Sequence, residues 1–73
     1  MKTTTMETGM KNAISIFKKA GLGEIRKIAV LEASGSTGKY DNLLFSIEYC
    51  KAWGDNYYSI ELSVYADGYY DFH

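Results

Sequence analysis

Gly35-Ser36-Thr37-Gly38-Lys39 is the first group of residues in this chain whose types could do chemistry. Glycine-rich backbone and a lysine are the parts that a phosphate-binding loop uses to hold phosphates. The spacing does not fit, because that motif separates its glycines more widely and has a serine or threonine after the lysine, where this chain has Tyr40. We therefore interpret residues 34–39 as a flexible connection of small polar residues.

The second group is a cysteine and a histidine, which serve as nucleophile and base in covalent catalysis. Cys50 is the only cysteine, and the only histidine is His73 at the carboxyl end, where chains usually fray. We interpret Cys50 as a structural thiol at a strand end. A lone cysteine also cannot form the disulfide framework that a secreted domain of this size usually needs, which favours a cytoplasmic location.

The third group consists of carboxylates that could bind a hard cation. Its members are Glu48, Asp55, Glu61, Asp67 and Asp71. Their spacing does not match a calcium-binding loop, so we expect solvated side chains and no metal site. The sequence thus predicts no catalytic residue, no metal and no cofactor, and we expect the chain not to be an enzyme.

Residues 1–73 are predicted to form a single domain, because 73 residues can build only one hydrophobic core. Its first element is a helix from about Thr5 to Ala20, where apolar residues recur at helical spacing. The apolar stripe consists of Met6, Met10, Ala13, Ile14 and Phe17. Thr4 and Glu7 have the spacing of a capping box, and Gly21 matches a left-handed glycine cap.

Two residues depart from this helical pattern. Gly9 is expected to weaken the helix by about 1 kcal/mol relative to alanine. Ile16 lies off the apolar stripe, so we regard it as an exposed candidate for a contact.

After Gly23 the apolar residues follow the period of two that is typical of strands, and strands are predicted over residues 25–33, 43–50 and 57–64. The segment Ile28 to Leu31 is apolar on both faces, so we favour a central position for the first strand, or a cover on both sides. The turn between the last two strands is predicted at Trp53-Gly54-Asp55-Asn56. In the later strands, the residues predicted to face inward are Leu43, Phe45, Ile47, Tyr49, Tyr58, Ile60, Leu62 and Val64.

The length of the last predicted turn, between Val64 and Tyr70, determines how the two flanking segments pair. A two-residue loop would place Asp71 opposite Val64 and bury a carboxylate. A three-residue loop, Ala66-Asp67-Gly68, instead pairs Val64 with Tyr70 and Leu62 with Phe72, which leaves Tyr65 beside Tyr69 and Ser63 beside Asp71 on the outer face. We choose the second loop. The predicted fold is α+β, with the helix packed on one face of three or four antiparallel strands in a meander.

Charge is distributed unevenly along the chain, although the net charge is only -1. Residues 1–39 hold seven basic and three acidic side chains, whereas residues 40–73 hold one basic and six acidic side chains and all seven tyrosines. The predicted outer face of the last two strands is therefore aromatic and acidic, and we expect it to lack lysine and arginine. Tyrosine is enriched in protein interfaces, so this face is predicted to bind a protein with a basic surface. The predicted binding residues are Tyr57, Glu61, Tyr65, Asp67, Tyr69 and Asp71.

In size and surface composition the chain resembles the small, motif-poor, acidic-faced inhibitors encoded by bacteriophages and mobile elements, including anti-CRISPR proteins. That resemblance implies a stoichiometric, non-catalytic inhibitor or regulator of a nucleic-acid-handling protein. It implies no particular site residue.

Two other functions remain open at this point. One is a small nucleic-acid-binding module, for which direct binding is disfavoured because the basic residues are scattered. Its residues would be Lys11, Lys18, Lys19, Arg26, Lys27 and Lys39. The other is a homo-oligomeric structural domain, such as a homodimer, that pairs its exposed edge strands. We expect no membrane association, since no apolar run approaches the length of about 18 residues that a spanning helix needs.

Overall fold

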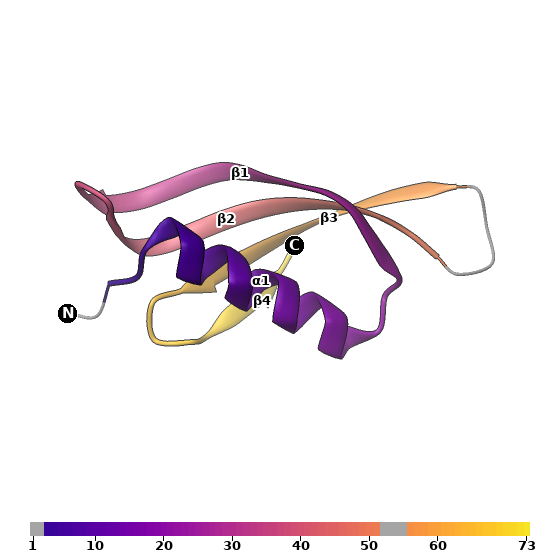
Figure 1. Ribbon diagram of the computed structural model, residues 1–73, viewed down its shortest axis with the longest axis horizontal. Coiled ribbons are helices and arrows are strands. Elements are labelled where there is room, and N and C mark those ends of the chain that lie inside the picture. Colours follow the sequence, from indigo (N-terminus) through magenta and orange to yellow (C-terminus); the bar gives the residue numbers. More distant parts are fainter. Residues whose placement is uncertain (1–2, 52–55) are drawn as a thin grey trace.

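The structure is a computed structural model that describes residues 3–51 and 56–73, and it shows one helix followed by a four-stranded antiparallel sheet (Figure 1). The elements are α1 (Met6–Ala20), β1 (Glu24–Ser36), β2 (Lys39–Cys50), β3 (Tyr57–Tyr65) and β4 (Tyr70–Phe72). Neighbours in the sheet are also neighbours in the sequence, so the predicted α+β meander is confirmed. Most of the predicted turn at Trp53 to Asn56 lies outside the described residues.

The amino end of α1 differs from the prediction. Thr5, and not Thr4, is the N-cap, and its side-chain oxygen accepts the Thr8 backbone N–H at 3.3 Å. Thr4 instead forms an isolated antiparallel β-bridge with Tyr40. The Thr4 N–H donates to the Tyr40 carbonyl at 2.8 Å, and the Tyr40 N–H donates to the Thr4 carbonyl at 2.7 Å. The carboxyl end agrees with the prediction, since Gly21 adopts φ of 65° and its N–H donates to the Lys18 carbonyl.

The helix packs with its apolar stripe on β2 and β3 (Figure 1). Ala13 and Phe17 are fully buried against the sheet, and the Phe17 ring lies edge-on to the Tyr49 ring at a centroid distance of 5.2 Å. Ile16, which lies off the apolar stripe, is partly buried and packs against the core. Gly9 is buried where a Cβ atom would collide with the Leu43 side chain, so the residue that weakens the helix also allows it to approach the sheet.

Alternation in β2 and β3 follows the prediction. Leu43, Phe45, Ile47, Leu62 and Val64 are at most 1% exposed and form the centre of the core. Their cross-strand pairing is regular from Asn42 to Cys50 on β2 and from Tyr57 to Tyr65 on β3, with no bulge between them. Because the pairing is regular, residues at even and odd positions point to opposite faces over these two segments.

The position of β1 contradicts the sequence prediction. It forms an edge of the sheet and is neither central nor covered on both sides. Its register with β2 shifts between Ile25 and Lys27, between Val30 and Glu32 and again near Gly35, so its side chains do not alternate simply. The strand also continues to Ser36, so that the predicted flexible connection at 34–39 is reduced to a tight turn at Thr37 and Gly38.

The register of the last hairpin matches the three-residue loop. Val64 pairs with Tyr70, Leu62 with Phe72 and Ser63 with Asp71. Gly68 has φ of 92°, and its N–H donates to the Tyr65 carbonyl at 2.9 Å. The predicted loop is therefore confirmed.

The molecule is elongated, with principal extents of 42 × 19 × 19 Å. The described ends of β2 and β3 near Cys50 and Tyr57 extend beyond α1 (Figure 1). Within residues 3–51 and 56–73, no helix has the length and apolar character needed to cross a membrane.

Candidate functional site

The candidate site is the outer face of the sheet, meaning the face opposite α1. Since cross-strand partners point to the same side, the register assigns the outward positions on each strand. They are Glu24, Lys27, Ala29, Glu32 and Ser34 on β1, Asn42, Leu44, Ser46, Glu48 and Cys50 on β2, Tyr57, Ser59, Glu61, Ser63 and Tyr65 on β3, and Asp71 on β4. No described helix or strand lies on this face, because α1 packs on the other one.

One end of the outer face, which we name the turn end, carries Tyr65, Tyr69 and Asp67. The two tyrosine rings lie 5.7 Å apart between centroids at 42°, and Tyr69 is 66% exposed. The Asp67 carboxylate accepts the Tyr69 backbone N–H at 3.0 Å, which holds the turn in shape. Three of the predicted binding residues are therefore brought together here.

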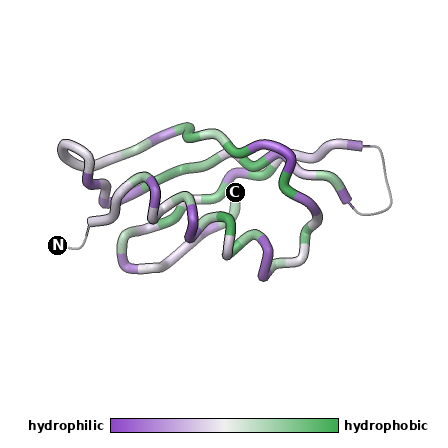
Figure 2. Tube along the Cα trace, in the orientation of Figure 1, coloured by the Kyte–Doolittle hydropathy of each residue, from purple (hydrophilic) through white to green (hydrophobic). Residues whose placement is uncertain are grey.

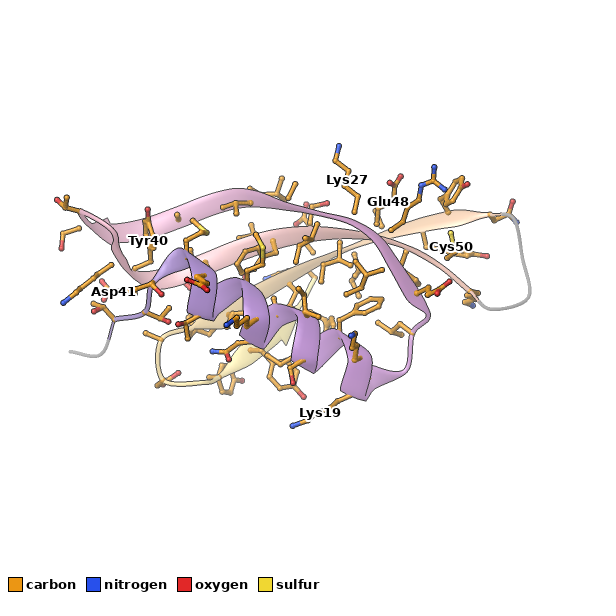
Figure 3. The ribbon with its side chains drawn as sticks, viewed as in Figure 1. Lys19, Lys27, Tyr40, Asp41, Glu48 and Cys50 are labelled. Carbon is orange, nitrogen blue, oxygen red and sulfur yellow. The ribbon has the colours of Figure 1, made fainter. Side chains whose placement is uncertain are left out.

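The opposite end, which we name the hairpin end, carries Tyr57, which is 53% exposed. The Arg26 guanidinium lies 4.2 Å from the centre of the Tyr57 ring and donates to its hydroxyl. On β1, Lys27 pairs with Glu48 and points away from the helix (Figure 3). The expectation that this face lacks lysine and arginine is therefore wrong, because it considered only the last two strands and missed what β1 adds.

Between the two ends lies a polar middle. Glu61 and Asp71 are exposed on neighbouring strands, and His73 continues the pairing of β4 by donating its backbone N–H to the Glu61 carbonyl at 2.9 Å. The His73 Nε2 atom lies 2.8 Å from the Ser63 hydroxyl oxygen. Sequence reasoning missed this contact because it depends on the hairpin register and on the sheet continuing past Phe72.

The Ser63 and His73 pair has the two residue types of a nucleophile and a base. Such a pair needs a third group that orients the histidine, and donors for the oxyanion. Among the described residues, the His73 ring makes no other hydrogen bond, and both side chains lie on an open strand surface. We therefore assign to this contact the role of tying His73 to β3.

Three further carboxylates that were not among the predicted binding residues belong to the outer face. Glu24 and Glu32 on β1 and Glu48 on β2 join Glu61 and Asp71, so five strand carboxylates face outward on the same side as the cations Arg26 and Lys27. This part of the outer face also has a shallow hollow of about 210 Å³. It is lined by Lys27, Ala29, Leu31, Ser46, Glu48 and Ser59.

The six basic residues of the alternative prediction do not form one patch. Lys19 points away from the sheet on the helix side, whereas Lys27 points to the outer face (Figure 3). Lys11 lies 3.7 Å from Glu7 on the exposed helix surface, and Lys39 lies at the β1–β2 turn. Lys18 is in the last turn of α1. Of the six, Arg26 contacts an outer tyrosine, Tyr57, and Lys27 lies on the same face beside Glu48.

Cys50 is partly buried at the end of β2, between Glu24 on β1 and Tyr57 on β3. His73, the one histidine that could act as a base for Cys50, lies in the polar middle of the outer face, where its backbone pairs with Glu61. Among residues 3–51 and 56–73, no group of three His, Cys, Asp or Glu side chains is placed to hold a metal ion.

Comparison with known proteins gives no relative: no protein-family model, no curated protein and no solved structure matches this chain.

Proposed function

We propose that this chain is a non-catalytic protein-binding module whose outer sheet face binds the basic surface of a protein partner. The single observation that supports this most is that the whole outer face is open, while its tyrosines lie at both ends of a stretch with five carboxylates. A sheet needs only one covered face to build a core, so the open face is available for a partner.

The chemistry of the face suits a protein surface rich in lysine and arginine. Tyrosine buries a large area with little loss of rotamer freedom, and Tyr57, Tyr65 and Tyr69 supply it at positions far enough apart to fix an orientation. The carboxylates accelerate association with a cationic partner and disfavour an anionic one. The shallow hollow between the tyrosines gives room for a projecting side chain or ridge of the partner.

A stoichiometric inhibitor of a nucleic-acid-handling protein, of the kind encoded by phages and mobile elements, would use such a face. The competing function is direct binding of nucleic acid. It is favoured by one observation, which is that the Arg26 guanidinium packs on the Tyr57 ring at the hairpin end. Stacking sites for single-stranded nucleic acid combine aromatic rings with basic residues in this way. The carboxylates on the rest of the face oppose it.

The test compares three immobilised proteins as baits in host lysate, with bound proteins identified by mass spectrometry and then remeasured in purified form. The first bait is the parent, the second carries Glu61→Lys with Asp71→Lys, and the third carries Lys18→Glu with Lys19→Glu. We expect a partner that binds the parent and the lysine-pair variant but binds the outer-face variant at least about tenfold more weakly, chiefly through slower association. Added salt should weaken binding of the parent in the same direction.

The matched control is stability, because both double variants change exposed side chains and should unfold within about 0.5 kcal/mol of the parent. Gel shifts with single- and double-stranded oligonucleotides test the competing function. The proposal is overturned if binding is lost only in the lysine-pair variant. It is equally overturned if the parent binds oligonucleotides and Glu61→Lys with Asp71→Lys strengthens that binding.

A further inference from the structure

The β1 strand is open on more sides than any other strand of the sheet. It is 13 residues long and lies at a sheet edge, whereas the other edge, β4, has 3 residues. From Val30 to Ser36 every residue is exposed. An edge of this length presents a row of unpaired backbone groups that can pair with another strand.

The inner side of β1 is also incompletely covered. The helix packs on β2 and β3, so the β1 side chains that share the inner face lie beside the helix and not beneath it. Val30, which shares this inner face, is 38% exposed, and Leu31, which lies at the register shift and lines the outer-face hollow, is 52% exposed. Figure 2 shows a hydrophobic stretch in β1 that lies between two hydrophilic segments of the strand. Burial of this stretch would be favourable, and a partner strand along β1 would provide it.

We propose that β1 pairs antiparallel with β1 of a second copy of this chain, about a two-fold axis at Ala29, to form one continuous sheet through both copies. Of the two edge strands of the described sheet, β1 has the length for such a contact and β4 does not. The pairing of one strand with itself about a two-fold axis is antiparallel by symmetry. This inference is independent of the proposed function, because the outer face stays open in the dimer.

The position of the axis follows from which side chains share a face. Ile28 pairs with Ile47 and Val30 with Phe45, so both point inward, while Ala29 pairs with Ser46 and points outward. An axis at Ala29 places Ile28 of each copy beside Val30 of the other, so that two inward-pointing apolar side chains are neighbours. An axis at Val30 would place Ile28 against Glu32, and an axis at Ile28 would place Glu24 against Glu32. The axis at Ala29 avoids both conflicts.

The same axis makes the charges complementary. Glu32 of each copy lies opposite the Arg26–Lys27 segment of the other, which creates two identical attractive contacts at the two ends of an apolar centre. The register shifts at Arg26 and Leu31 confine regular pairing to the segment 27–30. Because bulges of this kind limit edge pairing, we expect a weak dimer with a dissociation constant on the order of 10–1,000 μM.

The experiment is sedimentation equilibrium of the parent chain from about 5 μM to 1 mM. We expect the mass to rise from that of a monomer towards twice that value. Glu32→Lys should remain monomeric, because it places cations opposite Arg26 and Lys27. Arg26→Glu with Lys27→Glu should also remain monomeric, because it places carboxylates opposite Glu32. An equimolar mixture of these two variants should dimerise again, since each contact then joins opposite charges.

Asp71→Lys on β4 is the matched control, and its mass should follow that of the parent. A parent that stays monomeric to 1 mM overturns the proposal, and so does dimerisation that persists in both charge variants or that the mixture fails to restore. If either variant does not fold, amide hydrogen exchange of the parent at low and high concentration decides the question. Protection of the 27–30 amides that rises with concentration supports the paired edge, and unchanged protection contradicts it.

Discussion

The two faces of this sheet are made by the same strands and differ in almost every property. On β2 and β3 the inner residues are aliphatic or aromatic and are mostly buried, while their immediate neighbours in the sequence are mainly serine, glutamate and tyrosine and are exposed or only partly buried. One helix covers the inner face of β2 and β3, and no second layer covers the outer face in the described part of the chain. The buried core therefore lies on one face, and the proposed partner surface is the other.

The largest expected effect is truncation on the inner face. Phe17→Ala and Leu62→Ala should each lower the free energy of unfolding by about 2–5 kcal/mol, because both side chains are fully buried and leave a cavity between helix and sheet. Chemical denaturation measures the loss. Glu61→Ala, next to Leu62 but on the outer face, is the control and should change stability by less than about 0.5 kcal/mol. Equal losses in Leu62→Ala and Glu61→Ala would contradict the distinction between the two faces.

A smaller effect is expected at the contact between helix and sheet. Gly9→Ala improves helix propensity by about 1 kcal/mol, but its methyl group meets the buried Leu43 side chain. Overpacking should prevail and give a net loss of about 1–2 kcal/mol, measured by thermal and chemical denaturation. A double variant with Leu43→Ala makes room for the methyl group, so Gly9→Ala should be less harmful in that background. A net gain in the single variant would mean that the helix does not need to approach the sheet this closely.

The smallest effect concerns the turn that sets which residues of β4 face inward. Gly68→Val should cost about 1–2 kcal/mol, because a β-branched residue is strained at φ of 92°. No atom lies within 4 Å of the position where a Cβ would sit, so the cost arises from the backbone alone. Gly68→Asn is the control and should cost clearly less, since asparagine tolerates positive φ better. If both variants melt together with the parent, the turn does not depend on this conformation.

The accuracy of the prediction from sequence differs between β2–β3 and β1. Alternation is clear from Leu43 to Cys50 and from Tyr57 to Val64, and the assignment of faces there was confirmed. In β1 the extra residues at Arg26 and Leu31 break the period, and the apolar run at 28–31 imitates a central strand. Propensity and pattern are local, whereas edge position depends on which strands pair, so the β1 prediction was wrong. The contribution of Arg26 and Lys27 to the outer face was missed for the same reason.

By itself the sequence determined the order of the elements, the inner residues of β2 and β3 and the register of the last hairpin. Each of these depends on interactions between residues close in the chain, namely helical periodicity, strand alternation and a glycine at positive φ. Tertiary structure alone decided that β1 is an edge, that Gly9 is needed where α1 meets Leu43, and that Arg26 and Glu32 join the acidic tyrosine face. These outcomes depend on contacts between residues far apart in the chain. A sequence pattern is local and does not show which of those residues the sheet brings together.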